Sequence, residues 1–170
     1  PILMVGFNRR FAPHIHKIKS LLAPISEPKS IIMTVNAGFI PKESWIHDKS
    51  IGGGRILGEA CHFIDLLKYI CGSDIVDYQI TNMKCDKDDT STINLRFSEG
   101  SMGTIHYFSN GSRSVVKERI EIFTQGKILQ LNNFKTLKGF GFKNFRRMNL
   151  WRQDKGQKNC VVCHDSAEFH

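Results

Sequence analysis

The hydrophobic pattern of this 170-residue chain changes period at Gly72, and this change constrains the fold more than any other feature. Apolar residues in the segment 55–71 recur every three or four positions, which predicts an amphipathic helix that Gly72 caps. After Gly72, five segments alternate apolar and polar residues, and the short turns between them predict antiparallel strands. These strands are expected at 74–83, 90–97, 101–108, 118–123 and 127–131.

Several further elements are expected before this helix. Residues 13–22 have apolar positions at helical spacing, whereas residues 30–35 are rich in β-branched and apolar side chains and predict a strand. A short strand is expected at 2–7, and a loop at 36–50. Together these elements predict an α+β fold, an open and mostly antiparallel β-sheet with helices packed on one face.

Composition excludes some classes of protein and leaves others open. The chain is 41% hydrophobic and 24% charged, which excludes a disordered chain. No apolar run approaches the roughly 18 residues of a membrane-spanning helix, so we expect no membrane partner. The formal net charge of +8 fits an anionic substrate, an acidic partner domain or nucleic acid equally well. Five cysteines, an odd number, do not suggest a disulfide framework, so we expect a reducing, cytoplasmic setting.

The start of the chain suggests a piece of a longer protein. Residues 2–5 follow Pro1 directly and already have the composition of a buried strand. We expect residues 1–158 to form one domain and residues 159–170 to form an irregular or truncated tail.

The glycine-rich start of the predicted helix is the strongest functional motif. Three consecutive glycines, 52–54, leave a helix N-terminus open to close approach by a ligand. Glu59, His62 and Asp65 follow at i, i+3 and i+6, so they share one ridge of the helix. An imidazole between carboxylates can be held in one tautomer with its pKa near neutrality, as a general acid or base requires. A capped helix whose histidine only hydrogen-bonds a neighbour is the alternative.

Two segments carry a resemblance to the glucose–fructose oxidoreductase/inositol dehydrogenase (Gfo/Idh/MocA) family. Val-Gly-Phe-Asn-Arg-Arg-Phe at 5–11 resembles the start of that family's second domain. Gly-Gly-Gly-Arg-Ile-Leu-Gly-Glu-Ala-Cys-His-Phe-Ile-Asp at 52–65 resembles its signature, in which three glycines precede an Asp, a Gly, a His and an Asp. His62 matches the signature histidine, whereas Gly58 stands where the first Asp is expected and Glu59 follows one position later.

The resemblance covers roughly residues 2–158. The segments 103–108 and 148–156 resemble a sub-branch whose members are often fused to an alcohol-dehydrogenase-like module. The family implies an oxidoreductase that moves a hydride between NAD or NADP and a hydroxyl of a sugar, an inositol or a nucleotide-sugar.

The resemblance also implies partners for this chain. The family's N-terminal Rossmann domain binds the dinucleotide, and a Glu-Lys-Pro motif precedes the second domain. Neither that motif nor Gly-x-Gly-x-x-Gly occurs in these 170 residues, so we expect the chain to be inactive alone and to bind no cofactor by itself. It would be a substrate-binding and oligomerisation domain, with a sugar-like substrate, a Rossmann domain and, through its sheet face, another copy as partners.

The resemblance assigns candidate site residues. His62 would be the catalytic residue with Glu59, and Arg9 would reach a substrate hydroxyl or carboxylate. Arg10 is equally well explained by a structural salt bridge, and His106 by a satisfied position within the sheet. No metal site is expected. The substrate-binding candidates are Asn8, Arg9, Trp45, Gly54, Arg55 and Lys117.

Three alternatives to the oxidoreductase interpretation remain: a non-catalytic module, a nucleic-acid-binding module, and a haem or zinc site near the end of the chain. The chain would be a non-catalytic dimerisation or scaffold module if it used the same sheet without a cofactor domain. Residues 138–145 nearly match the RNA-recognition strand RNP1, but Lys143 occupies a position that the motif reserves for the core, so nucleic acid is the weaker alternative. Cys-Val-Val-Cys-His at 160–164 matches c-type haem attachment or part of a zinc site, although a truncated or unstructured end explains it better.

Overall fold

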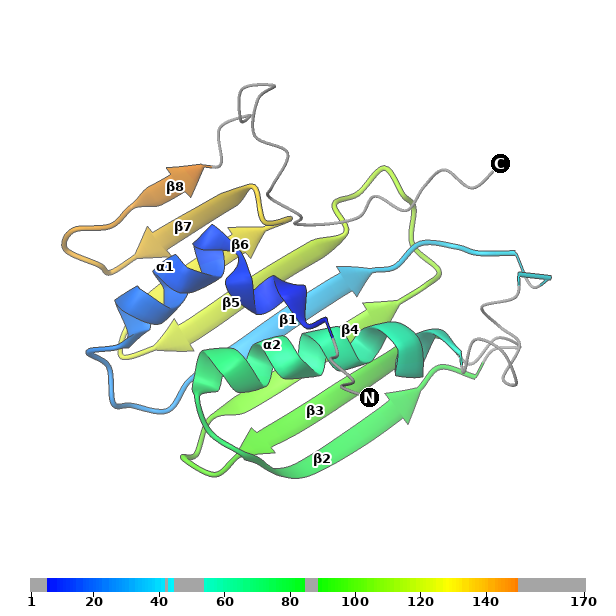
Figure 1. Ribbon diagram of the computed structural model, residues 1–170, viewed down its shortest axis with the longest axis horizontal. Helices are drawn as coiled ribbons and strands as arrows, with labels where there is room; N and C mark the ends of the chain where they lie inside the picture. The colour runs from blue at the N-terminus through cyan, green and yellow to red at the C-terminus, as the bar shows by residue number, and fades with distance from the viewer. Residues whose placement is uncertain (1–5, 42, 45–53, 85–88, 150–170) are drawn as a thin grey trace, which may run out of the picture.

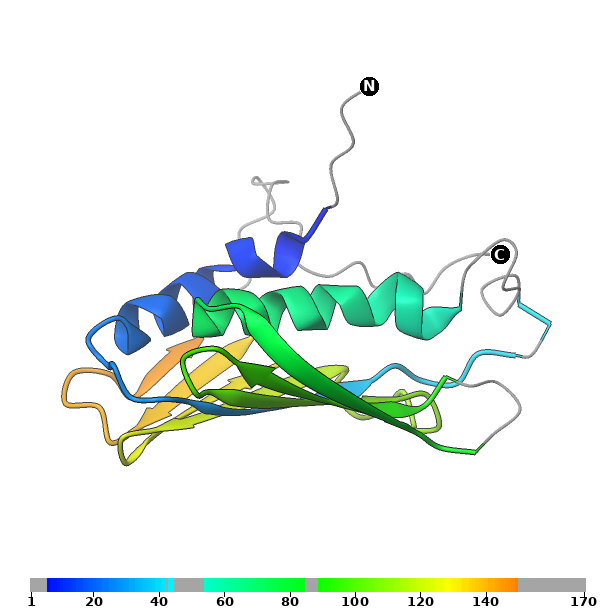
Figure 2. The same ribbon diagram turned by 90° about the horizontal axis from the view of Figure 1, so that it is seen from below.

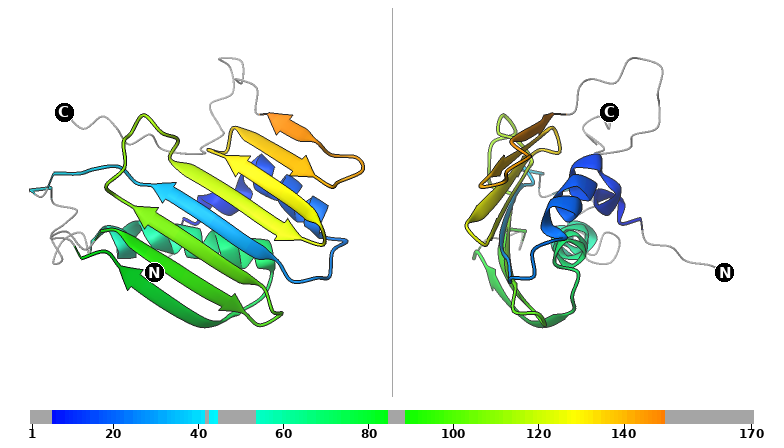
Figure 3. Two further views of the ribbon diagram at one scale, coloured as in Figure 1. Left: turned by 180° about the vertical axis from the view of Figure 1, so that it is seen from behind. Right: turned by 90° about the vertical axis from the view of Figure 1, so that its left-hand side faces the viewer.

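The computed structural model describes residues 6–41, 43–44, 54–84 and 89–149, and these form two layers. One layer is an eight-stranded sheet and the other consists of helices that all lie on one face of it (Figures 1 and 2). None of the described helices lies on the opposite face of the sheet (Figure 3). This arrangement confirms the predicted α+β fold.

The helical elements are few and short. They are η1, a 3₁₀ turn at Asn8–Phe11, α1 at Pro13–Leu22, η3, a π-helical turn at Ile56–Ala60, and α2 at Cys61–Cys71. The strands are β1 (Ser30–Asn36), β2 (Ile75–Asn82), β3 (Ser91–Phe97), β4 (Met102–Phe108), β5 (Glu118–Thr124), β6 (Lys127–Asn132), β7 (Thr136–Phe140) and β8 (Arg147–Asn149).

The strand β1 lies in the middle of the sheet. The spatial order is β2-β3-β4-β1-β5-β6-β7-β8, so β1 separates β4 from β5. It runs parallel to β4, with Met33 opposite Ile105, and antiparallel to β5, with Met33 opposite Ile120. All other neighbouring strands are antiparallel. The end of β1 therefore lies between the end of β4 and the start of β5, close to the start of the helix η3–α2.

Helix α2 packs tightly on the sheet. Gly72 ends it in the left-handed conformation, with φ of 74°, as its position after the last apolar residue predicted. Phe63, Leu66, Leu67 and Ile70 are buried on the side that faces the strands. A Cβ atom on Gly103 of β4 would lie 2.7 Å from Leu67 Cδ2, so this glycine permits the close approach of helix and sheet.

The strands β7 and β8 extend the sheet beyond the strands expected from the sequence. Phe140 is exposed at the end of β7, and Gly141 follows with φ of 77°. Phe142 then packs against the core and Phe145 is buried. Because a turn separates Phe140 from Phe142, these side chains do not share one strand face, as the RNP1 interpretation required. Lys143 is exposed, not directed to the core.

Two sequence predictions concern the ends of the chain. Gly6 and Phe7 do not belong to a strand, so the strand expected at 2–7 is wrong at these two positions. Residues 1–5 lie outside the described part of the chain. The segment 150–170, with its Cys-Val-Val-Cys-His motif and the predicted irregular tail, also lies outside it.

Candidate functional site

The candidate site lies at the N-terminal end of the helix η3–α2. Gly54 precedes it with φ of +85°, a conformation that favours glycine. The sequence predicted a continuous α-helix from residue 55, but residues Ile56–Ala60 form a π-helical turn. Such turns close i to i+5 hydrogen bonds and are frequent at functional sites. Glu59 and His62 are therefore not joined by the uninterrupted α-helix that placed them on one ridge.

Glu59 turns instead toward the sheet. The Tyr107 hydroxyl of β4 donates a hydrogen bond to Glu59 Oε2 at 2.5 Å, and Lys117 Nζ lies 2.8 Å from Glu59 Oε1. Burial alone would raise the pKa of Glu59, but Lys117, Tyr107 and Arg55 together lower it below its ordinary value. Burial and the nearby carboxylate raise the pKa of Tyr107. The pair is therefore an ionised carboxylate held by a neutral phenol.

Lys117 is the most exposed of the three contacting residues Tyr107, Glu59 and Lys117. It immediately precedes β5, and its side chain is 40% exposed, compared with 25% for Glu59. One lysine ammonium is thus held by a carboxylate and still open to a ligand. Arg55, by contrast, is buried and has partners within the chain on several sides.

His62 lies in the first turn of α2 with a neutral imidazole. Its ring meets Phe7 edge to face, with centroids 5.5 Å apart. Burial lowers the pKa of His62, as does the nearby Arg9, and the carboxylates around it only partly oppose this shift. The carboxylates were expected to set this pKa, and that expectation is wrong because burial and Arg9 outweigh them. His62 Nδ1 is buried and has no hydrogen-bond partner among the described residues.

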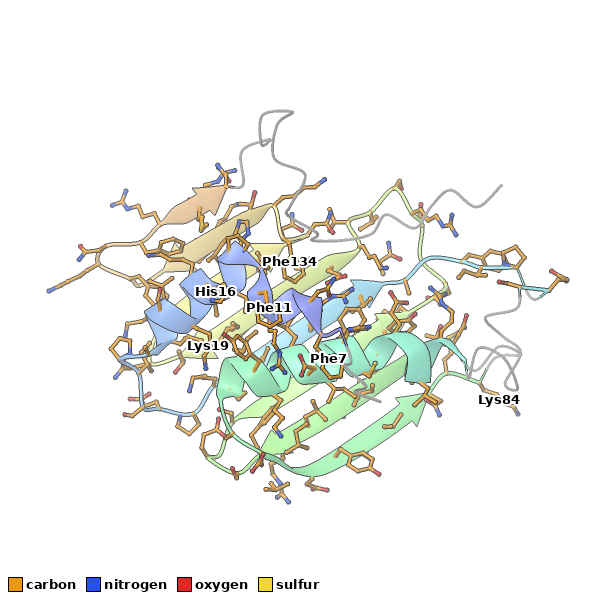
Figure 4. All side chains as sticks on the ribbon, viewed as in Figure 1. Phe7, Phe11, His16, Lys19, Lys84 and Phe134 are labelled. Carbon is orange, nitrogen blue, oxygen red and sulfur yellow. The ribbon has the colours of Figure 1, made fainter. Side chains whose placement is uncertain are left out.

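Two arginines hold the N-terminal segment against α2. Arg9 forms two hydrogen bonds with Glu118 of β5 and lies over the ring of Phe63. Arg10 binds Asp65 through Nε, 3.0 Å from Oδ2, and through Nη2 to Oδ1. The structural salt bridge expected as one interpretation of Arg10 is therefore confirmed. Figure 4 shows that the segment places Phe7 over α2.

The structure brings together some of the predicted site residues. Glu59, Arg55 and Lys117 form one connected group, and His62 follows on the next turn. Asn8 is exposed on η1, and Trp45 lies outside the described residues. A catalytic or substrate-binding role for each of these residues stays a prediction. His106 was expected to be a hydrogen-bonded residue within the sheet, and this is confirmed, because its Nδ1 lies 3.1 Å from Thr92 Oγ1.

Three polar residues at this site were not identified from the sequence. Tyr107 occupies a buried position of an alternating strand, and a buried tyrosine hydroxyl usually needs a partner, so that signal was available. Glu118 is also buried at the start of a strand, next to Lys117. Asp89 follows the segment 85–88 that the structure leaves undescribed, and nothing in the sequence marks it.

Other kinds of site find little support in the described part of the chain. No group of three or more His, Cys, Asp or Glu side chains there could hold a metal ion. Cys61 and Cys71 are both free thiols, and burial raises the pKa of Cys71 to about 12. None of the described helices is long and apolar enough to cross a membrane.

Comparisons with known proteins agree on one family. The sequence matches the family described as GFO/IDH/MocA C-terminal domain over residues 16–129. It is 31% identical over 146 residues to myo-inositol 2-dehydrogenase of Thermotoga maritima, covering 77% of this chain and 41% of that protein. It is 29% identical over 134 residues to an uncharacterized oxidoreductase, YrbE, of Bacillus subtilis, covering 71% of this chain and 37% of that protein. The chain thus spans well under half the length of these relatives.

Solved structures show the same fold. Levoglucosan dehydrogenase in complex with NADH superposes with a TM-score of 0.73 at 21% identity, covering 88% of this chain and 47% of that chain. An oxidoreductase domain protein from Kribbella flavida gives a TM-score of 0.71 at 22% identity, covering 86% of this chain and 46% of that chain.

Proposed function

Because this chain belongs to the GFO/IDH/MocA family, as a C-terminal domain of its oxidoreductases, we propose that it binds the substrate of an NAD- or NADP-dependent dehydrogenase. The proposed substrate class is a hydroxyl group of a sugar, an inositol or a nucleotide-sugar. The relative named myo-inositol 2-dehydrogenase supports this class. Since the chain spans only part of that relative, the dinucleotide would be held mainly by a partner domain of Rossmann type.

One observation carries the proposal. The partly exposed ammonium of Lys117 is held by the ionised carboxylate of Glu59. Glu59 lies in the π-helical turn just before His62, whose imidazole is neutral. Lys117 would donate a hydrogen bond to a substrate hydroxyl, and Glu59 would hold Lys117 in place. His62 would accept the proton that the hydroxyl releases, because a neutral imidazole is a competent base near neutral pH. Arg9, Asn8, Gly54 and Trp45 remain candidates for further substrate contacts.

We propose that this site meets only the reacting end of the dinucleotide. When bound, NAD or NADP supplies the acceptor for the hydride that leaves the carbon of the oxidised alcohol. His62 is the residue proposed to face that end, since its ring is neutral and the residue is only partly buried. Among the described residues, no glycine turn links a strand directly to a helix to receive a pyrophosphate, so we do not expect this chain to bind the cofactor alone.

We also propose that the bare face of the sheet joins two copies of the chain. Large apolar side chains of β1 and β4 are exposed at the strand positions that alternate with the buried ones, among them Ile32, Met102 and Phe108. Light scattering would show a dimer that Met102→Glu disrupts. Tyr78→Glu, on the edge strand β2, is the matched control and should leave the dimer intact.

The experiment that tests the enzyme proposal joins this chain to the dinucleotide-binding domain of the Thermotoga maritima relative. Reduction of NAD or NADP is followed with myo-inositol, glucose and a nucleotide-sugar as probes. We expect turnover with at least one of them, and loss of that turnover when His62 is replaced. A folded fusion that binds NADH, forms dimers and turns over none of these probes would favour the scaffold alternative.

A further inference from the structure

Arg55, the first residue of the helical segment, carries a guanidinium that is buried. The side chain is 5% exposed. Its Nη1 donates a hydrogen bond to the carbonyl of Gly38 and its Nη2 to the carbonyl of Ala37, both at 2.8 Å. These carbonyls belong to the two residues beyond β1, so Arg55 joins the start of the helix to the end of the central strand.

Carboxylates also surround this guanidinium. Arg55 Nη1 lies 3.7 Å from Asp89 Oδ2, and Nη2 lies 3.9 Å from Glu59 Oε2. Asp89 is itself buried and accepts a hydrogen bond of 2.5 Å from Ser109 Oγ. The guanidinium carbon also lies 5.6 Å from the centroid of the Tyr107 ring. Carbonyls, carboxylates and an aromatic ring of the chain itself therefore surround the charge.

We propose that Arg55 is a positioning residue that fixes the Glu59 carboxylate, and through it the Lys117 ammonium, without touching the substrate. The inference rests on the proposed function, because it concerns the same site. A buried charge is stable only when it is paired, and the planar fork of arginine can bind several acceptors at once. Burial of the fork argues against the substrate contact that the family resemblance suggested for Arg55.

The local backbone gives this role a second support. Arg55 directly precedes the π-helical turn Ile56–Ala60, and Glu59 lies within that turn, four residues after Arg55. Because π-helical turns are rare, we expect a contact that stabilises this one. Arg55 provides one, since it binds the loop after β1 on one side and approaches Glu59 on the other.

The first test measures the titration of Glu59 in the 170-residue chain by carbon-detected NMR. We expect the pKa of Glu59 to rise in Arg55→Lys and Arg55→Gln, because the carboxylate loses its fixed guanidinium. Arg96→Gln is the matched control, since Arg96 pairs with Asp77 on the exposed surface and should leave Glu59 unchanged. An unchanged Glu59 titration in a folded Arg55 variant would overturn the proposal.

The unmodified chain supplies a second measurement, which decides the matter even if both variants fail to fold. The side-chain nitrogen resonances of Arg55 should shift over the same pH range in which Glu59 titrates. If they do not follow that titration, Arg55 does not position Glu59.

The fusion enzyme separates positioning from substrate contact. Arg55→Lys is expected to raise KM by up to about tenfold, the effect expected of Lys117→Met, because it acts through the Lys117 hydrogen bond. In the Lys117→Met background Arg55→Lys should raise KM no further, whereas a further rise would show that Arg55 itself contacts the substrate and would overturn the inference. If the unmodified fusion has no activity, the proposed function fails, while the two NMR measurements still decide the role of Arg55.

Discussion

Arg9 and Glu118 stand 109 positions apart in the sequence and form a two-point ion pair. Nη2 lies 2.7 Å from Oε1, and Nε lies 3.1 Å from Oε2. The Glu118 side chain is 2% exposed and the Arg9 side chain 15%. The guanidinium also lies over Phe63, 4.5 Å from the ring centroid. One side chain thus ties the N-terminal segment to β5 across the face of α2.

Removal of this arginine should destabilise the chain strongly. Arg9→Ala leaves the buried Glu118 carboxylate without its partner, so the free energy of unfolding should fall by about 3 kcal/mol. Urea unfolding measures the loss. Arg96→Ala breaks an exposed pair with Asp77 and should cost less than about 1 kcal/mol. Equal losses in the two variants would show that burial adds nothing to the Arg9–Glu118 pair.

Gly103 of β4 is predicted to tolerate no side chain. In Gly103→Ala the new Cβ would lie 2.7 Å from Leu67 Cδ2, and Leu67 is fully buried and cannot move aside. Overpacking of this kind costs about 1–3 kcal/mol, which urea unfolding would detect. Gly6→Ala is the control, because nothing lies within 4 Å of a Cβ at that position. A loss no greater than that of the control would mean that α2 shifts freely over the sheet.

The sequence predicted the elements that have a strong period and missed those whose place depends on distant partners. The helix at 55–71 and the five strands after Gly72 appear within a few residues of their expected bounds. The central place of β1 was not predicted, because alternation within a strand says nothing about which strands flank it. Strands β7 and β8 were not predicted either, since both are short and Gly139 weakens the pattern of β7.

The candidate site was predicted in its residue types and not in its contacts. Sequence spacing put Glu59 and His62 on one ridge, which assumes an α-helix throughout. In the structure Glu59 lies in a π turn and accepts a hydrogen bond from Tyr107, a residue of a strand far along the chain. Lys117 was identified only by its place at a strand start, and its pairing with Glu59 depends on the position of β1 between β4 and β5.

His14 should make the chain less stable in acid. It is fully buried on α1, neither of its ring nitrogens has a hydrogen-bond partner among the described residues, and burial lowers its pKa from 6.5, with partial opposition from the nearby backbone of Met148 and Lys135. The unfolded chain binds the proton more readily, so stability is full above about pH 6.5 and falls as the pH decreases below that value. Between about pH 7.5 and pH 5.5 the contribution of His14 to this fall should be on the order of 1 kcal/mol.

The comparison of two histidines on one helix isolates this effect. Urea unfolding of His14→Leu should show a smaller fall with decreasing pH than the unmodified chain. His16→Leu should keep the full fall, because His16 is exposed on the same helix. His62 contributes equally in all three proteins. An identical pH dependence in His14→Leu and the unmodified chain would contradict the prediction.

Lys117 is expected to control both the charge of Glu59 and the binding of a hydroxyl ligand. In Lys117→Met the pKa of Glu59 should rise, because an ammonium at 2.8 Å and its hydrogen bond are lost. Binding of myo-inositol to the chain, followed by NMR titration, should weaken by about tenfold, the effect of one hydrogen bond to a charged group. Lys68→Met removes an exposed pair with Asp74 and serves as control. Unchanged binding would remove Lys117 from the substrate site.

His62 is predicted to be the proton acceptor of the fusion enzyme. In His62→Gln, kcat for alcohol oxidation should fall by about 10²- to 10⁴-fold, the range for loss of a general base. Unfolding by urea should change by less than about 1 kcal/mol, because no described residue hydrogen-bonds Nδ1. A variant that fails to fold would instead assign His62 a structural role.

The pH profile distinguishes this base from a residue that only shapes the site. Alcohol oxidation needs the neutral imidazole, and burial with the nearby Arg9 lowers the pKa of His62 below 6.5. The rate of the unmodified fusion should therefore persist to a pH below the ordinary histidine value and then decline as the ring takes up a proton. His62→Gln should lose that decline, whereas His16→Gln should retain it. An acid decline that survives in His62→Gln would assign the proton transfer to another group, with Lys117 the next to test.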